Sequence, residues 1–147
     1  MAERLLAGSD HAGLLLRAEA VRVARVAGFE VEDVGPAAGE KVDYPDQARQ
    51  VGEALSTGRA RFGILVCGTG IGMSIAANKL TGVRAAHCTT EFEARMARAH
   101  NDANVLCLGE RVVGLGLGAA IVTAFLTTRF EGGRHAERVA KIGALER

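Results

Sequence analysis

Short apolar runs alternate five times with longer stretches of helical spacing, and this alternation constrains the fold more than any other feature of the chain. The runs are Arg4–Gly8, Phe29–Val34, Phe62–Val66, Val83–His87 and Val105–Leu108. Short apolar runs are typical of parallel strands buried in a sheet. Phe29–Val34 instead alternates apolar and acidic residues, which predicts a less buried strand. The helical stretches are Leu14–Ala27, Asp43–Thr57, Met73–Lys79, Thr90–Ala99, Val113–Thr128 and Arg134–Leu145. The pattern predicts an α/β fold: a three-layer, Rossmann-like domain with a five-stranded parallel sheet, helices on both faces and a C-terminal helix.

Length and composition exclude several classes of protein. With 147 residues, 48% of them apolar and 24% charged, we expect residues 1–147 to form a single globular domain. A net charge of +1 without any basic run argues against binding to nucleic acid or to a membrane surface. No apolar run approaches the ~20 residues that span a bilayer, and the N-terminus lacks a signal-peptide core. We therefore expect a cytoplasmic protein.

The chain has three cysteines, Cys67, Cys88 and Cys107, none of them in a C-x-x-C pair. An odd number of separated cysteines in such a chain predicts reduced thiols rather than disulfides. Metal-ligand spacing such as H-x-x-x-H is absent as well, so no metal site is expected. Cys88 and Cys107 lie in or beside predicted strands, and we interpret both as packing residues.

The third strand leads into a glycine-rich turn that predicts a ligand site. Cys67 stands at the end of the strand, and Gly68, Gly70 and Gly72 follow at alternate positions before the next helix. Glycines let the backbone approach a ligand closely, and a helix start offers unpaired N–H groups and a positive dipole end. The segment therefore predicts a small pocket that favours anions beside a thiol. A buried structural cysteine in an ordinary strand-to-helix turn is the alternative.

Other polar residues gather at the same predicted edge of the sheet. Ligands of parallel sheets bind at the carboxyl ends of the strands, and Asp10 and His11 follow the first strand while His87 ends the fourth. Asp10 has an alternative role as N-cap of the next helix. We interpret His87 as structural. These positions place Asp10 and His11 with the Cys67 turn.

His100 and Asn101 belong to the turn that enters the fifth strand, so within one chain we expect them at the opposite edge. They reach the Cys67 pocket only from a neighbouring subunit or through an unusual loop. Arg134 and Arg138 are four residues apart and share a helix face, which predicts either a phosphate clamp or a solvated basic surface. The glycine spacing, and the lack of an acidic residue after the next strand, argue against a dinucleotide cofactor.

Taken together, the residues resemble the ribose-5-phosphate isomerase B family, which includes the galactose-6-phosphate isomerase subunits. The matching motifs are SDHAG at 9–13, DYP at 43–45, CGTGIGMSIAANK at 67–79, HNDANVLCLGERVVG at 100–114 and EGGRH at 131–135. They cover essentially the whole chain. The resemblance implies a homodimer or a dimer of dimers that isomerises a phosphorylated sugar between aldose and ketose without a metal or other cofactor.

The resemblance also implies residue roles. Cys67 is the expected base between C1 and C2, Thr69 handles a hydroxyl proton, and His100 assists ring opening with Asp10 nearby. The enediolate oxygens are held by the segment Gly68, Thr69, Gly70, Ile71 and Gly72. The phosphate-binding positions are His11, Arg111, Arg134 and Arg138, and further substrate contacts are Tyr44 and Asn101. One branch of the family uses a glutamate base instead, but this loop carries a cysteine and no acid.

The sequence leaves three hypotheses open. Interconversion of ribose 5-phosphate and ribulose 5-phosphate leads, with allose 6-phosphate or galactose 6-phosphate as alternative substrates. Galactose-type enzymes pair two different subunits that each lack part of the site, whereas this chain has every expected residue. A phosphosugar-binding sensor without turnover is the alternative of another class, and the presence of both Cys67 and His100 argues against it.

Overall fold

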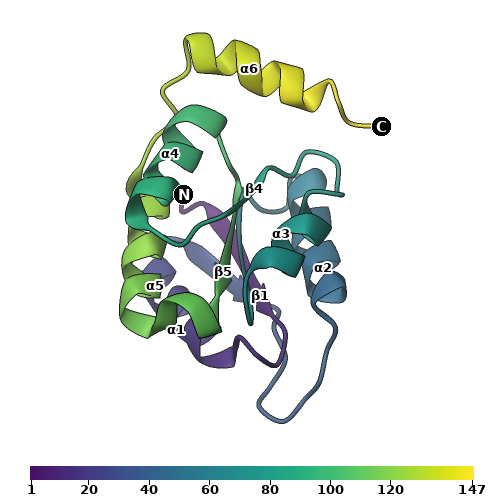
Figure 1. Cartoon of the computed structure of the whole chain (residues 1–147), viewed down its shortest axis with the longest axis vertical. Helices are drawn as coiled ribbons and strands as arrows, with labels where there is room; N and C mark the ends of the chain where they lie inside the picture. Colours follow the sequence, from purple (N-terminus) through teal and green to yellow (C-terminus); the bar gives the residue numbers. More distant parts are fainter.

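The computed structural model describes residues 1–147, and it confirms the predicted α/β architecture (Figure 1). The strands are β1 (Arg4–Ser9), β2 (Glu30–Asp33), β3 (Phe62–Cys67), β4 (Ala85–His87) and β5 (Val105–Gly109). The helices are α1 (Leu14–Val26), α2 (Tyr44–Ser56), α3 (Ile71–Ala77), α4 (Glu91–Asn101), α5 (Glu110–Thr127) and α6 (Arg134–Gly143).

All neighbouring strands pair in parallel, in the order β2-β1-β3-β5-β4. The last strand of the chain, β5, therefore lies inside the sheet between β3 and β4. This pairing sets Cys67 opposite Gly109 and His87 opposite Cys107. Residues that leave β5 thus start directly beside the turn that follows Cys67.

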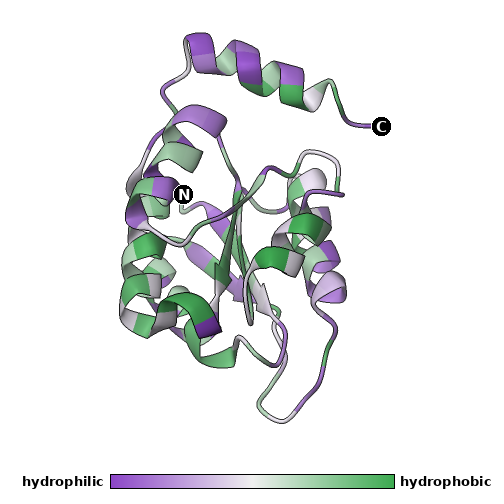
Figure 2. Ribbon diagram, viewed as in Figure 1, coloured by the Kyte–Doolittle hydropathy of each residue, from purple (hydrophilic) through white to green (hydrophobic).

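Two apolar cores, one on each face of the sheet, hold the layers together. Helices α1, α4 and α5 cover one face, where Leu16, Ile121 and Phe125 are fully buried. Helices α2 and α3 cover the other, where Val51 and Met73 are fully buried. The hydrophobic colouring of the central strands in Figure 2 follows from this burial on both faces.

Two helices begin earlier than the sequence predicts. Helix α3 starts at Ile71 rather than Met73, because Gly70 already caps it. Helix α5 starts at Glu110 rather than Val113, and it contains a break at Gly114, whose φ of 69° is not helical. A break is possible there because glycine adopts positive φ without steric cost.

Helix α5 is also long and apolar enough to cross a membrane, by length and composition alone. In this fold it packs against α1 and α4 and buries Ile121, Val122 and Phe125 over the sheet. Its place is that of a core helix.

The prediction that α4 ends at Ala99 is wrong. The helix continues through His100 to Asn101, and Asp102 closes it in the left-handed conformation. His100 and Asn101 thus stand on the last turn of a helix rather than in a loop. Because α4 returns toward the amino ends of the strands, they still lie at the edge opposite Cys67, as expected.

Candidate active site

A cleft of about 540 Å³ opens at the carboxyl edge of the sheet, where the sequence predicts the site. Nine of the expected site residues line it, together with Ala12 and Ile75, which the sequence does not single out. The nine are Asp10, His11, Tyr44, Cys67, Gly68, Thr69, Ile71, Gly72 and Arg111. A cleft of this size accommodates a small phosphorylated sugar.

The Cys67 sulfur lies at the head of α3. The backbone N–H of Gly70 donates a hydrogen bond to Cys67 Sγ at 3.1 Å, and the thiol is almost buried. Gly70 is the N-cap of α3 with a φ of 82°, a conformation that side chains other than glycine rarely adopt. The N–H of Ile71 donates to Thr69 Oγ1 at 3.2 Å. The turn therefore places a thiol, a hydroxyl and backbone N–H groups together at the cleft.

Strand β5 brings Arg111 to the same cleft. Its backbone N–H donates to the Gly68 carbonyl at 3.1 Å, so the start of α5 is joined to the turn after Cys67. Gly109 lies so close to Thr69 that any Cβ at this position would collide with the Thr69 backbone. The absence of a side chain at Gly109 is thus what allows the two segments to meet.

Asp10 follows β1 and is held by β3, because its backbone N–H donates to the Val66 carbonyl at 3.2 Å. Its Oδ1 accepts a hydrogen bond from the Ala12 N–H at 2.9 Å, whereas the N-cap of α1 is Gly13. The N-cap interpretation of Asp10 is therefore wrong. The turn instead presents Asp10 and His11 at the cleft.

His87 lies behind the turn rather than in the cleft. A Cβ on Gly70 would lie 2.8 Å from the His87 ring, so the imidazole packs directly against the backbone that carries the Cys67 hydrogen bond. Its Nε2 is buried without a hydrogen-bond partner. The sequence marked His87 only as a strand end, so this contact with Gly70 could not be predicted.

Of the five remaining expected residues, Gly70 lies in the turn itself, and the other four, His100, Asn101, Arg134 and Arg138, do not line the cleft. His100 stacks on His135 of α6, with the ring centroids 4.1 Å apart and the ring planes within 10° of parallel. Glu131 faces both rings, its carboxylate oxygens 3.8 Å from His100 Nε2 and 3.7 Å from His135 Nε2. Glu131 and His135 lie in the EGGRH motif, but only the folded chain shows that they contact His100.

The surroundings of His135 disfavour its charged form. Burial lowers the pKa of this imidazole most, and the electrostatic effects of His100, Arg134 and Arg138 lower it further against an opposing effect of Glu131. The donor atoms of His100, Glu131 and His135 lie within 4.8 Å of one another, close enough to share a metal ion. The parallel rings, however, direct their lone pairs side by side rather than at one point, so such binding requires one ring to turn.

All three cysteines are free, and two of them are far from reactive. Burial, with a smaller effect of Glu93, raises the pKa of Cys88 to about 12. Burial also raises the pKa of Cys107 well above its ordinary value. Both therefore behave as packing residues, as expected from the sequence, and Cys67 is the thiol that lines the cleft.

The fold and the cleft define an α/β protein with a cleft at the carboxyl edge of a parallel sheet, where a thiol lies beside a helix start. A family model described as Ribose/Galactose Isomerase matches residues 5–142. The chain belongs to this family of aldose–ketose isomerases.

Similar proteins agree with this assignment. Ribose-5-phosphate isomerase B of Escherichia coli (strain K12) is 47% identical over 144 residues, which is 98% of this chain and 97% of that protein. A solved structure of ribose-5-phosphate isomerase B from Clostridium thermocellum is 52% identical, with a TM-score of 0.93 over 97% of this chain and 96% of the other. D-Erythrulose-4-phosphate isomerase of Pectobacterium atrosepticum is 42% identical over 140 residues, covering 95% and 92% of the two chains.

Proposed function

We propose that this protein interconverts ribose 5-phosphate and ribulose 5-phosphate, with the Cys67 thiolate as the base. The observation that carries the proposal is the position of the Cys67 sulfur, which lines the cleft and lies 3.1 Å from the backbone nitrogen of Gly70, the N-cap of α3. A base for this reaction must lie beside donors that stabilise negative charge, because removing a proton next to a carbonyl leaves an oxyanion. The turn after β3 supplies both the thiol base and these backbone donors.

The proposed steps conserve atoms without a cofactor. Cys67 removes the proton from C2 of the open-chain aldose, and the electron pair moves through C1 to the carbonyl oxygen. The backbone N–H groups between Gly68 and Gly72 stabilise the enediolate oxygens, and the Thr69 hydroxyl relays the proton between them. Cys67 then returns its proton to C1, which gives the ketose and restores the thiolate.

Substrate binding and ring opening need the other residues. His11 and Arg111 at the cleft, with Arg134 and Arg138, are proposed to bind the phosphate, and Tyr44 and Asn101 to contact the sugar. His100 assists ring opening, with Asp10 nearby. Since His100, Asn101 and the α6 arginines do not line the cleft of their own chain, we propose that a second copy supplies them.

The surface of the chain supports a homodimer or a dimer of dimers. Helix α6 buries only His135, although it also carries Ile142, and Leu145 follows it; their side chains are 43% and 79% exposed. Helix α6 carries both hydrophobic and hydrophilic segments (Figure 2). Beside the cleft, Ile71 and Ile75 of α3 are also more than half exposed. Apolar side chains at both places favour contact with another copy.

An isomerase assay of the purified protein on aldose phosphates of four, five and six carbons tests the substrate. The length of the sugar is open, because the relatives named above act on ribose 5-phosphate and D-erythrulose 4-phosphate, and allose 6-phosphate and galactose 6-phosphate remain alternatives. We expect the highest kcat/KM with ribose 5-phosphate. A higher kcat/KM with another sugar phosphate would show that ribose 5-phosphate is not the preferred substrate.

Absence of turnover with any sugar, combined with binding, would instead support a phosphosugar-binding sensor.

The free thiols of all three cysteines are consistent with the reducing cytoplasm, which we propose as the location.

A further inference from the structure

Helix α4 ends at an aspartate in an uncommon backbone conformation. Asp102 has φ 46° and ψ 42°, and every other residue with positive φ in this chain is a glycine. The N–H of the next residue, Ala103, donates to the Ala97 carbonyl at 2.9 Å, which closes the helix immediately after Asn101. The left-handed conformation is unfavourable for a residue with a Cβ, although aspartate tolerates it better than most. Surrounding contacts must therefore hold Asp102 in place.

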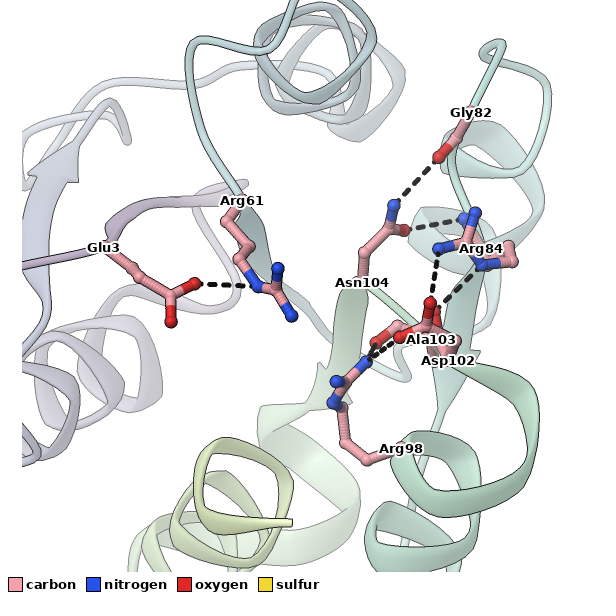
Figure 3. Close-up of polar contacts among 8 residues, drawn as sticks. All are labelled: Glu3, Arg61, Gly82, Arg84, Arg98, Asp102, Ala103 and Asn104. Carbon is pink, nitrogen blue, oxygen red and sulfur yellow. Dashed lines mark hydrogen bonds and ion pairs between the residues drawn. The ribbon is translucent and has the colours of Figure 1, made fainter. Parts of the chain in front are cut away.

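Two arginines hold this residue (Figure 3). Arg98 Nη1 donates to Asp102 Oδ1 at 2.9 Å and to the Ala103 carbonyl at 2.6 Å. Arg84 Nε donates to the Asp102 carbonyl at 2.9 Å, and its Nη2 lies 3.5 Å from Oδ2. The end of α4 is thereby tied both to its own preceding turn and to the segment that enters β4.

The two arginines are themselves anchored in the fold. Arg98 is only 3% exposed, and its guanidinium lies over the rings of Phe62, 4.9 Å away, and Phe125, 5.8 Å away. Its Nε has no hydrogen-bond partner, so Asp102 is the one carboxylate that compensates this buried charge. The Arg84 backbone N–H donates to Asn104 Oδ1 at 2.8 Å, and Asn104 Nδ2 donates to the Gly82 carbonyl at 2.8 Å.

We propose that Asp102 is a positioning residue, which fixes the last turn of α4 and thereby the directions in which His100 and Asn101 project toward the site of a second copy. The proposal rests on the roles given to those two residues in the proposed function. Asp102 follows Asn101 directly, and its carboxylate is bound on the far side by Arg84 and Arg98. A change at Asp102 therefore acts on the reaction through the position of the helix end.

The variants Asp102→Asn and Asp102→Gly separate the contribution of the carboxylate from that of the left-handed backbone conformation. Asparagine tolerates the left-handed conformation and keeps a hydrogen-bond acceptor but loses the charge. Glycine keeps the conformation and removes the carboxylate that both arginines contact, so that only the bond from Arg84 to the backbone carbonyl remains. Glu3→Gln is the matched control, because the Glu3–Arg61 ion pair of 2.7 Å also lies at this edge but touches neither α4 nor the cleft (Figure 3).

We expect kcat for ribose 5-phosphate to fall about 10- to 100-fold in Asp102→Gly, the scale that small misplacements of reacting groups produce, and less in Asp102→Asn. Glu3→Gln should leave kcat unchanged. In a double-mutant cycle, Asp102→Asn should cost little further kcat in a His100→Gln background, since it acts through His100. The same fold-loss in both backgrounds would overturn the proposal and leave Asp102 a purely structural cap.

Imidazole NMR of His100 gives a readout that does not depend on turnover. We expect its ¹⁵N and ¹³C ring shifts to change in Asp102→Asn and Asp102→Gly and to stay fixed in Glu3→Gln. If the wild type turns over no sugar, the proposed function fails while this measurement still tests the coupling. Unchanged His100 signals in a folded Asp102→Asn protein would overturn the proposal, even if Asp102→Gly does not fold.

Discussion

At the scale of single residues, the chemistry depends on Cys67. We expect Cys67→Ala to lower kcat by about 100- to 10,000-fold, the usual contribution of a general base, with KM changed only a few-fold. Cys88→Ala is the control, because Cys88 is equally buried but lies outside the cleft. Steady-state kinetics of both variants measure the difference. Turnover in Cys67→Ala at the wild-type rate would end the proposal of a thiol base.

Alkylation provides an independent check on the same residue. Iodoacetamide at about pH 8 should inactivate the protein, and bound substrate should protect it. Mass spectrometry should find the label on Cys67, since burial raises the pKa of Cys88 to about 12 and keeps the Cys107 thiol protonated.

His135 gives the fold a defined dependence on pH. Its pKa in the folded chain lies below the ordinary value of 6.5, because burial and the electrostatic effects of His100, Arg134 and Arg138 outweigh Glu131. Between these two pKa values the unfolded chain binds more protons than the folded one, so stability rises with pH in that window and falls as the pH drops below about 6.5. We expect the urea midpoint to decrease between pH 7.5 and 5.5, and to decrease less in His135→Gln. An equal decrease in both proteins would show that other groups cause it.

At the scale of elements, α6 carries the proposed phosphate clamp. Arg134→Ala or Arg138→Ala should weaken binding of ribose 5-phosphate by about 1–3 kcal/mol, the scale of charge-assisted hydrogen bonds. Lys141→Ala is the matched control, since Lys141 is an exposed cation on the same helix. Inhibition by an unphosphorylated pentonate should remain nearly unchanged in the arginine variants. If the arginine variants lose affinity for both ligands equally, the arginines are structural.

The elements also show where sequence reasoning succeeds and where it does not. The sequence predicted all five strands. Burial on both faces leaves a strong local signal in β1, β3 and β5, whereas β2 lies at the edge of the sheet and was predicted from its alternating pattern. The end of α4 was missed because the left-handed conformation of Asp102 has contacts with Arg84, which is distant in sequence, as well as with Arg98 of the same helix. Because ligand sites of parallel sheets lie at the carboxyl ends of the strands, the sequence correctly placed Asp10 near Cys67. The contacts of Glu131 and His135 with His100 could not be predicted in this way, because they depend on how α6 packs on α4.

At the scale of the whole molecule, the proposed sharing of sites predicts complementation. Homodimers of Cys67→Ala and of His100→Ala should each be nearly inactive. After subunit exchange, about half of the dimers are mixed, and each mixed dimer has one intact and one doubly damaged site, so roughly a quarter of all sites recover. Mass spectrometry verifies the exchange, and the isomerase assay measures the recovery. Complete exchange without recovered activity would place His100 in the cleft of its own subunit.

The position of β5 inside the sheet has a consequence for the order in which the chain can fold. During synthesis β4 leaves the ribosome before β5, yet β4 pairs with no strand other than β5. A nascent chain that ends before Val105 therefore has β3 as an open edge and β4 without a partner. Unpaired edges of this kind favour aggregation, and parallel pairing between distant segments is slow. The growing chain consequently depends on its final third to complete the sheet, and a ribosome stalled before that point exposes an aggregation-prone intermediate.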